Sequence, residues 1–307
     1  MTQTPTLTGT ADVPAVSLDG AGPTERGWGK APKPYRRRRT RVLNAVGFVV
    51  VLVFSIFPAL VMLSTAFDAR ANDGSRALLP SDPSFDNFSF VLGEAGFGRF
   101  LLNSLLVGLG TVVASGLLAL LAAVAVARFR FRLRTTVLVL VLVVQMVPLE
   151  ALVIPLFIQA SSLQVINSLI ALTVVYVAFS LPFAIWMLRG FVAAVPKELE
   201  EAAYLDGASW PRMFWSVLFP LVAPGLVATS VFSFITAWNE FVFAITFLDD
   251  ESKFTVAAGL RQFFTQYGTD WGSVMAGSTL ITVPVMIFFV LVQRRLSEGL
   301  VAGAVKG

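Results

Sequence analysis

The chain has 307 residues, of which 56% are hydrophobic and only 14% are charged, whereas a soluble domain has roughly 25% charged residues. It contains no histidine and no cysteine, which excludes disulfides, zinc sites that need either residue, and every nucleophile activated by histidine. The net charge of +4 does not indicate a nucleic-acid partner, because the basic residues lie beside apolar runs, as in a membrane protein. We therefore expect helices that face lipid or one another, with no catalytic residue and no metal site.

The N-terminal segment, residues 1–41, is rich in Thr, Pro, Gly and Ala and ends in a basic run that includes Arg36 to Arg39. Such a composition cannot bury enough apolar area to fold alone, so we expect a disordered basic tail. The apolar run 42–67 that follows is longer than the ~7–15-residue core of a cleaved signal peptide. It predicts an uncleaved first membrane helix.

Five further apolar runs are each close to the ~20 residues that a helix needs to cross a bilayer. Together with the first run, they predict an all-α integral membrane domain of six transmembrane helices over residues 42–307. Pro148 and Pro155 in the third run and Pro224 in the fifth are tolerated if neighbouring helices satisfy the freed carbonyl groups. The predicted spans are 42–67, 100–127, 135–158, 167–188, 222–248 and 273–292.

The second span contains four small residues, Gly108, Gly110, Ser115 and Gly116. Small side chains let the backbone of another helix approach closely, which indicates a packed bundle. The alternative is a flexible helix without a special partner.

Lys and Arg are concentrated in the loops on one side of the predicted membrane. They occupy the N-terminal tail, the short loop 128–134, the segment 189–212 and the C-terminal end, whereas the loops 68–99 and 249–272 on the other side are acidic. Basic loops face the cytoplasm, so both the N-terminus and the C-terminus are predicted to be cytoplasmic.

The longest basic-side segment, residues 191–220, has the sequence signals of two short helices. Pro196 suits the first position of a helix, and Gly207 suits the left-handed residue that ends it. Ser209 can cap a second, amphipathic helix that ends near Pro220. On physical grounds alone, such a hairpin could equally lie on the membrane surface. The first helix presents Leu199, Ala202 and Ala203 on one face, and the second has an apolar stripe of Trp210, Met213, Phe214, Val217 and Leu218.

This segment resembles the EAA loop of ATP-binding-cassette importer permeases, whose consensus is E-A-A-x3-G-x9-I-x-L-P. Here Val217 and Phe219 replace the usual Ile and Leu. The resemblance implies a type I importer permease architecture, in which the loop is a coupling helix that docks into a cleft on a cytoplasmic ATPase subunit. It assigns the ATPase-coupling role to Glu201, Ala202, Ala203, Asp206, Gly207, Val217 and Pro220.

Further segments resemble the carbohydrate type of this family, and within it the smaller, six-helix permease of the maltose-like pair. The similarity covers about residues 42–307, and only the N-terminal extension falls outside it. The segments are Asn103-Ser104-Leu105, Trp238-Asn239-Glu240-Phe241, Asp270-Trp271-Gly272 and the C-terminal tail 299–307.

The resemblance implies an assembly in the bacterial plasma membrane with a homologous second permease, a dimer of ATPase subunits and an extracytoplasmic sugar-binding protein. This chain has no G-x-x-x-x-G-K-[ST] phosphate loop, so ATP and Mg are expected on the partner ATPase, with no cofactor here and no enzymatic activity of its own. The implied function is import of di- or oligosaccharides by alternating access, in which helices reorient to open the cavity to one side at a time.

Polar side chains inside the apolar spans are expensive unless they face the bundle interior or a wet cavity. Helix geometry places Asn239 and Glu240 beyond the midplane of the fifth span, next to Trp238, and places Gln145 near the middle of the third. Because a sugar offers hydroxyl groups and no charge, these four residues are the candidate translocation pathway. The alternative is that Asn239 and Glu240 only cap or bridge helices, and for Glu150 that structural interpretation is favoured.

The acidic-side loop 249–272 has too many aromatic residues for a purely solvated turn. In the family that it resembles, the corresponding loop enters the sugar-binding protein, so we expect a contact surface here. The alternative is packing against the partner permease. The candidate contact residues are Phe263, Phe264, Tyr267 and Trp271.

Two other functions fit the hydropathy pattern. A permease of the same architecture could carry a glycerophosphodiester or a polyamine, although those paths should be rich in basic residues or in carboxylates, and the spans have few of either. An ion-coupled secondary transporter would need no ATPase and no coupling loop. An intramembrane enzyme is disfavoured by the lack of histidine, cysteine and any paired Asp motif.

Overall fold

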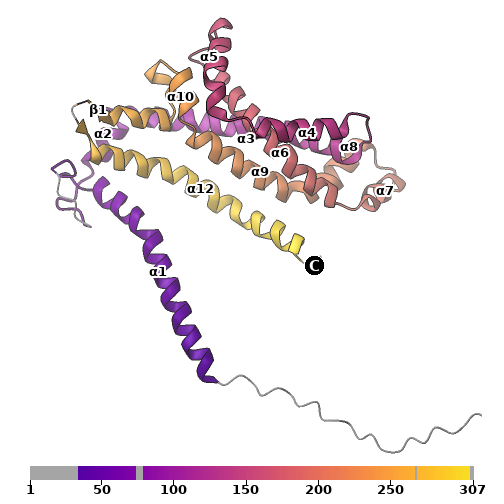
Figure 1. Ribbon diagram of the computed structural model, residues 1–307, viewed down its shortest axis with the longest axis horizontal. Helices are drawn as coiled ribbons and strands as arrows, with labels where there is room; N and C mark the ends of the chain where they lie inside the picture. The colour runs from indigo at the N-terminus through magenta and orange to yellow at the C-terminus, as the bar shows by residue number, and fades with distance from the viewer. Residues whose placement is uncertain (1–33, 74–78, 267, 305–307) are drawn as a thin grey trace, which may run out of the picture. The chain divides into compact units, whose positions relative to one another are not determined.

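The computed structural model (Figure 1) describes residues 34–73, 79–266 and 268–304, and describes side chains from residue 40 to residue 293 within those ranges. The chain divides into two compact units after Ser55, and the fold described below is that of the second unit. Residues 1–33 of the predicted tail lie outside the described residues. Residues 34–41 are helical rather than disordered, because arginine has a high helix propensity and the apolar helix that follows extends through them.

Helices make up most of the described chain. The long ones are α1 (Pro34–Ala66), α3 (Phe97–Arg128), α6 (Leu169–Ala194), α9 (Phe219–Asn239) and α12 (Trp271–Ala304). The short ones are α2 (Asp86–Leu92), α4 (Arg134–Gln145), α5 (Val153–Ser162), α7 (Lys197–Leu205), α8 (Trp210–Met213), α10 (Val242–Phe247) and α11 (Val256–Gly259). A π-helical turn occupies Phe214–Leu218, and 3-10 turns occupy Leu149–Leu152, Glu251–Lys253 and Leu260–Phe263. Strand β1 (Phe264–Thr265) pairs antiparallel with β2 (Gly268–Thr269).

The predicted membrane spans are confirmed in number when one bent pair of helices counts as a single span. Within the described ranges, five continuous helices are long and apolar enough to cross a bilayer, and α4 with the segment after it makes a sixth. The five are Thr40–Ala66, Phe97–Arg128, Leu169–Ala194, Trp210–Asn239 and Trp271–Gln293, and the pair is Arg134–Gln145 with Leu149–Ser162.

The prediction of a continuous third span over 135–158 is wrong. The chain bends by 92° between Gln145 and Leu149, so that α4 and α5 are separate helices. Pro148 at the bend is extended, with ψ at 125°, and a proline also disfavours helical geometry in the residue before it. Broken helices at membrane depth occur where protein or a cavity covers the exposed backbone.

The fifth span begins earlier and ends earlier than predicted. The second helix of the 191–220 hairpin does not stop at Pro220 but runs through the π-helical turn into α9, so that Trp210–Asn239 is one span. Pro220 lies just after this π-helical turn, where the regular i to i−4 hydrogen bonding of the helix is already interrupted. The predicted end at residue 248 is wrong because Glu240 adopts an extended conformation and separates α9 from α10.

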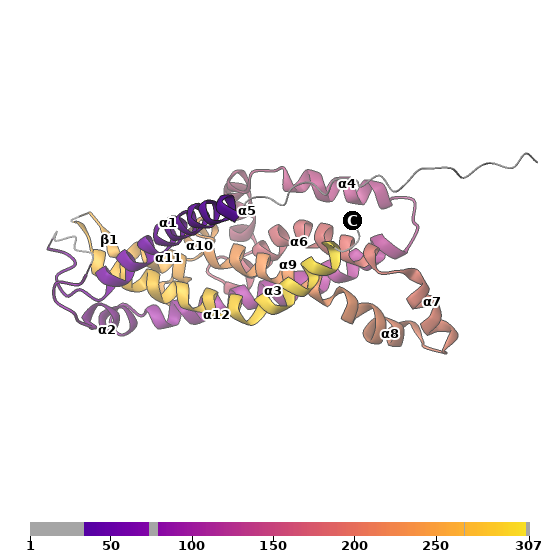
Figure 2. The ribbon, with the colours of Figure 1, turned by 90° about the horizontal axis from the view of Figure 1, so that it is seen from below.

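The second unit is built around α3, α6 and α9, which lie side by side, with α12 along α9 (Figures 1 and 2). Small residues of α3 permit this packing, as the sequence predicts. A Cβ added at Gly108 would lie 3.0 Å from the Phe234 ring of α9, and one added at Gly110 would lie 3.2 Å from Thr173 of α6. The close approach therefore occurs within this chain.

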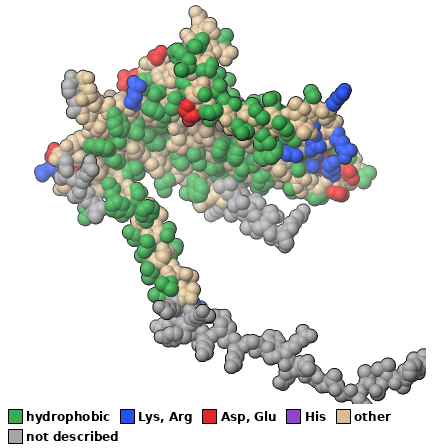
Figure 3. Space-filling view, in the orientation of Figure 1, with side chains coloured by type: hydrophobic (Ala, Val, Ile, Leu, Met, Phe, Trp, Pro, Cys, Tyr) green, Lys and Arg blue, Asp and Glu red, His purple; other side chains and the backbone are tan. Residues whose placement is uncertain are grey.

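The two ends of this bundle differ in charge. Helices α7 and α8 lie at one end, while α2 and the β1–β2 hairpin lie at the other (Figures 1 and 2). Figure 3 shows Lys and Arg side chains gathered at the α7–α8 end and hydrophobic side chains over the middle. We call these the basic end, with Arg128, Arg130, Arg132, Arg134, Lys197 and Arg212, and the acidic end, with Asp68, Asp82, Asp86, Asp249, Asp250 and Asp270.

Candidate functional site

The segment 191–220, the coupling loop, forms the predicted helix and turn. Helix α7 carries Glu198 and Glu200 in its first turn, where their charges favour the positive end of the helix dipole. It stops before Gly207, whose φ of +80° is the left-handed conformation that the sequence predicts. The amide of Gly207 donates to the carbonyl of Tyr204 at 3.0 Å, and that of Ala208 donates to Ala203 at 2.9 Å. These bonds close the C-terminal end of α7.

Most of α7 and its turn is exposed. Glu201 and Asp206 are exposed, whereas Ala203 packs against a buried cluster that joins α3, α6 and α8. Leu205 is 89% exposed, so a partner that covered it would gain the roughly 1.5–3 kcal/mol that burying a leucine contributes. Leu205 is not on the apolar face that the sequence predicts for α7, because the i, i+3, i+4 pattern runs through Leu199 and Ala203 instead. Its position two residues before Gly207, at the end of a short helix, is the sequence feature that could have identified Leu205 as an exposed apolar residue.

The second half of the hairpin is anchored rather than exposed. Met213, Phe214 and Leu218 are buried in the same cluster, and Trp210 stacks on Phe214 with ring centroids 5.4 Å apart. Val217 is half-buried and Pro220 is exposed at the start of α9, so these two shape the base of the hairpin. The N-terminal cap at Ser209 lacks the predicted side-chain hydrogen bond.

Among the described side chains, α7 forms an ion pair with a residue outside the coupling loop. The Nε of Arg128, the last residue of α3, lies 2.6 Å from Oε1 of Glu200. In the sequence, Arg128 stands out only as one of several basic residues in a predicted loop. Nothing local to the sequence pairs it with a glutamate so far along the chain.

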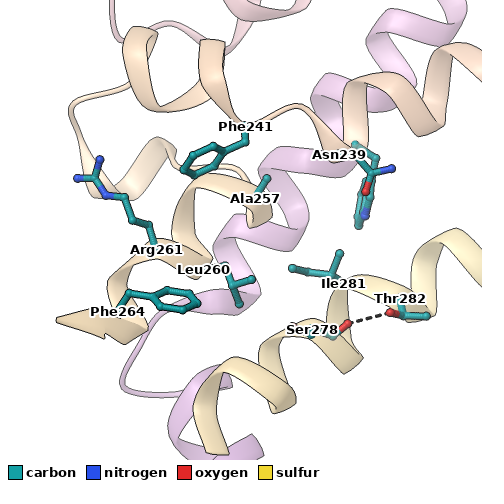
Figure 4. Close-up of a pocket in the computed structure, with 10 residues that line it drawn as sticks. Asn239, Phe241, Ala257, Leu260, Arg261, Phe264, Ser278, Ile281 and Thr282 are labelled. Carbon is teal, nitrogen blue, oxygen red and sulfur yellow. Dashed lines mark hydrogen bonds between the residues drawn. The ribbon is translucent and has the colours of Figure 1, made fainter. Parts of the chain in front are cut away.

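A cavity of about 470 Å³ lies at the acidic end, where α9 gives way to α10. Figure 4 shows Asn239 and Phe241 on one side of it and Ser278, Ile281 and Thr282 of α12 on the other. We call it the outer cavity. Its lining consists of Trp238, Asn239, Phe241, Ala257, Leu260, Arg261, Phe264, Ser278, Ile281 and Thr282.

The structure brings two of the four predicted pathway residues to this cavity. Asn239 is exposed and donates from its amide to the Ile235 carbonyl at 2.9 Å, while Trp238 is buried and its indole Nε1 has no hydrogen-bond partner. Gln145 ends α4 and Glu150 lies in the 3-10 turn after the bend, both exposed and away from the cavity lining.

Glu240 instead bridges helices. Its carboxylate accepts a hydrogen bond from the Tyr176 hydroxyl at 2.6 Å, and it accepts the amides of Phe243 and Ala244 at 3.0–3.2 Å. These bonds cap α10 and join it to α6. The geometry favours the capping interpretation of Glu240, and a pathway role stays a prediction.

The acidic-side loop 249–272, the outer loop, is held by α3. The amide of Asn103 donates to the carbonyls of Ser252 and Phe254, both at 3.0 Å. The hydroxyl of Ser104 accepts the amide of Val256 at 2.8 Å. Asn103 and Ser104 were singled out in the sequence only by resemblance, and the structure gives them an anchoring role.

The predicted contact residues of the outer loop separate into two kinds. Phe264 and Trp271 are exposed, so they can serve as a contact surface. Phe263 is 5% exposed and packs against Phe97 with ring centroids 6.1 Å apart, because the 3-10 turn directs it into the core. Phe263 therefore anchors the outer loop to the core and is not available as a contact residue. Tyr267 lies outside the described residues.

Two carboxylates organise the rest of the acidic end. The amides of Ser81 and Arg70 hold the pKa of Asp68 below its ordinary value. Burial raises the pKa of Asp270, but hydrogen bonds from the hydroxyl of Ser273 and the amide of Asn72 outweigh it and hold that pKa below its ordinary value. Both groups are thus bound as carboxylates.

Comparison with known proteins gives a consistent result. Residues 115–301 match the family described as binding-protein-dependent transport system inner membrane component. The diacetylchitobiose uptake system permease protein DasC of Streptomyces coelicolor is 40% identical over 269 residues, which cover 87% of this chain and 98% of that protein. The trehalose transport system permease protein SugB of Mycobacterium tuberculosis is 34% identical over 265 residues, covering 86% and 97%. A bacterial ABC transporter for alginate import has the same fold, with a TM-score of 0.74 at 21% identity, covering 86% of this chain and 99% of that one.

Proposed function

Because this chain belongs to the family of binding-protein-dependent transport system inner membrane components, we propose that it is a membrane-spanning permease of an ATP-driven oligosaccharide importer. Relatives that match nearly its whole length are named for the uptake of diacetylchitobiose and trehalose, which supports a di- or oligosaccharide as the substrate. The observation that carries the proposal is the exposed helix α7 with its left-handed Gly207 turn.

Helix α7 is the docking element for a separate cytoplasmic ATPase dimer, which binds ATP and Mg. The concentration of basic residues supports placing this end, and both termini, in the cytoplasm. The exposed Leu205 and the small side chain of Ala202 let α7 enter a cleft on the partner closely. Glu201 and Asp206 add charged contacts at the rim of that cleft. ATP-driven closure of the dimer then moves α7 and reorients the helices behind it.

A second permease completes the membrane part of the assembly. Helix α4 has no buried residue although most of its residues are apolar, and the chain bends by 92° between α4 and the segment that leads into α5. Lipid can cover apolar side chains, but a break in a helix that lies within the membrane needs cover from protein or a cavity. We assign this cover to a homologous permease, with the solute path between the two chains.

The sugar path includes the outer cavity. Its aromatic faces, Phe241 and Phe264, suit the apolar faces of sugar rings, while Asn239 and the hydroxyls of α12 can exchange hydrogen bonds with sugar hydroxyls. An extracytoplasmic sugar-binding protein delivers the substrate from this side, in contact with the exposed Phe264 and Trp271.

The docking role is tested with Leu205→Arg in the reconstituted importer. The added charge should remove the apolar contact, weaken co-purification of the ATPase, and lower sugar uptake by about tenfold. Leu133→Arg is the matched control, because Leu133 is also exposed at the basic end, at 62%, but lies outside α7, and it should behave as wild type. Normal uptake and normal ATPase recovery in Leu205→Arg would contradict the proposed docking role of α7. Sugar uptake by a wild-type chain that recovers no ATPase would instead favour an ion-coupled transporter.

The substrate class is tested separately through the binding protein. Purified binding protein is offered maltose, trehalose, diacetylchitobiose, a glycerophosphodiester and a polyamine, and uptake is then measured in proteoliposomes that contain both permeases and the ATPase. Retention and uptake of a disaccharide are expected. Selective uptake of the phosphodiester or the polyamine would replace the sugar while leaving the coupling mechanism in place.

A further inference from the structure

The end of α3 is joined to two other elements by one side chain. The Nε of Arg128 donates to Oε1 of Glu200, in the first turn of α7, at 2.6 Å. Its Nη2 donates to the carbonyl of Val195 at 2.9 Å, and Val195 caps the C-terminal end of α6. A single guanidinium thus connects α3, α6 and α7.

This ion pair is much better shielded from water than the other one found among the described side chains. The Arg128 and Glu200 side chains are 10% and 12% exposed, whereas Arg70 and Asp82, 3.6 Å apart at the acidic end, are 64% and 53% exposed. Exposed pairs contribute little, but removing one partner of a shielded pair leaves an uncompensated charge and is strongly unfavourable. The Arg128–Glu200 pair therefore imposes a real constraint on where α7 can lie.

The geometry of the pair depends on arginine. The two donors leave Arg128 from different nitrogens of one planar group, so the position of Glu200 and that of Val195 are fixed together. Arg128 is also the last residue of α3, and Glu200 is near the start of α7, so each charge lies where the helix dipole favours it. The bond to Val195 satisfies a carbonyl at the end of α6 that has no partner within its own helix turn.

The surroundings explain why α7 needs this connection. Of the residues of α7, Ala203 packs against the buried apolar cluster. The cluster itself includes Ala123 of α3 and Leu188 and Val192 of α6, which pack α3 and α6 together. A small cavity of about 160 Å³, lined by Arg128, Glu200, Tyr204, Trp210 and others, lies beside the pair. Apolar packing alone therefore leaves α7 loosely attached to α3 and α6.

We propose that Arg128 is a positioning residue, which makes α7 move as one body with the cytoplasmic ends of α3 and α6. This inference rests on the proposed function, since it takes α7 to be the element that the ATPase moves. Without the pair, α7 still docks on the ATPase through its exposed face, but its displacement is transmitted less completely to the membrane helices. ATP is then hydrolysed with less transport.

The test compares sugar uptake with ATP hydrolysis in the same proteoliposomes that hold the complete importer. In Arg128→Gln and in Glu200→Gln, uptake per ATP hydrolysed should fall by about fivefold to tenfold, while the ATPase stays bound. Arg128→Lys should be intermediate, because one ammonium nitrogen cannot reproduce the fork that holds both Glu200 and Val195. The exposed neighbour Arg130→Gln is the matched control and should keep the wild-type ratio.

A second measurement separates positioning from a general loss of structure. Because the chain has no cysteine, Arg128→Cys/Glu200→Cys introduces a unique pair that a short bis-maleimide can bridge. The bridged protein should regain most of the uptake per ATP that the unbridged protein loses, which a misfolded protein could not do. A wild-type ratio of uptake to ATP hydrolysis in Arg128→Gln, or no recovery of that ratio when the two cysteines are bridged, would overturn the inference. The proposed function would still stand in that case, provided that the wild-type chain couples ATP hydrolysis to uptake. A wild-type chain that neither recovers nor stimulates the ATPase would overturn the proposed function itself.

Discussion

The acidic end and the basic end of the bundle are held together in different ways. At the acidic end, side-chain hydrogen bonds join segments far apart in sequence: Asn103 and Ser104 hold the outer loop, and Asn72 bonds Asp270 at 2.9 Å. At the basic end, α7 is joined to the bundle chiefly by the Arg128–Glu200 pair and a little apolar packing. The difference suits a rigid platform at the acidic end, and it leaves α7 at the basic end dependent on one ion pair for its connection to α3 and α6.

That contrast has a physical basis. A segment held by many hydrogen bonds to buried groups moves only when several of them break together, whereas a segment with few buried contacts opens at low free-energy cost. At the basic end, the Arg128–Glu200 pair is therefore the main contact that keeps α7 from moving apart from α3 and α6. Substitutions at the two ends can show whether the acidic end is held more firmly than the basic end.

The largest effect is expected where the outer loop is anchored. Asn103→Leu removes the amide that the Ser252 and Phe254 carbonyls bind, so the free energy of unfolding should fall by about 2–4 kcal/mol. Thermal unfolding of the purified chain in detergent measures this. Asn239→Leu is the control, because the Asn239 amide donates within its own helix and its side chain is exposed, and it should leave the midpoint nearly unchanged. Equal midpoints for the two variants would refute the anchoring role.

The next effect tests how tightly the two ends are packed. A Cβ added at Gly259, in α11 at the acidic end, would collide with the Phe100 ring, so Gly259→Ala should destabilise the chain by about 1–3 kcal/mol. Gly190, in the last turns of α6 toward the basic end, has no atom within 4 Å of an added Cβ, and Gly190→Ala should cost nothing. The same unfolding assay compares them. A neutral Gly259→Ala would mean that α11 shifts easily and is no rigid platform.

Sequence alone predicted the features that depend on local composition. Hydropathy located the spans found among the described residues, although not the break in the third or the bounds of the fifth, because about twenty apolar residues in a row are long enough to cross a bilayer as a helix. The Gly207 turn followed from glycine's freedom at positive φ, and the close approach at Gly108 followed from its lack of a side chain. Each of these properties belongs to a residue or to its immediate neighbours.

The features that sequence missed depend on residues distant in the chain. The bend after Gln145 was missed because prolines are tolerated in many membrane helices, and only tertiary cover decides whether the helix kinks or breaks. The split at Glu240 is fixed by the hydroxyl of Tyr176, which comes from a different helix. The Arg128–Glu200 pair likewise joins residues from separate helices. The candidate site was therefore predictable at α7 itself but not in its attachment to the bundle.

A smaller effect distinguishes the two interpretations of Glu240. If it only bridges α6 and α10, Glu240→Gln and Tyr176→Phe should destabilise non-additively, with a coupling free energy of about 1–2 kcal/mol, and the KM for sugar uptake should stay unchanged. A double-mutant cycle on the unfolding midpoint, combined with uptake kinetics, measures both quantities. A raised KM in Glu240→Gln with an unchanged midpoint would instead favour contact with the sugar.

The smallest effect is the acid dependence of the acidic end. The amide of Ser81, followed by that of Arg70, holds the pKa of Asp68 below its ordinary value of 3.8. Because the folded pKa is the lower one, Asp68 stabilises the fold above pH 3.8, and this stabilisation is lost as the pH falls through the folded pKa. Asp68→Asn should make the decline of unfolding free energy below that pH less steep, with no change in slope near neutral pH. An identical acid decline in wild type and Asp68→Asn would show that these backbone bonds do not hold the carboxylate, and the acidic end would then be less rigid than its hydrogen bonds imply.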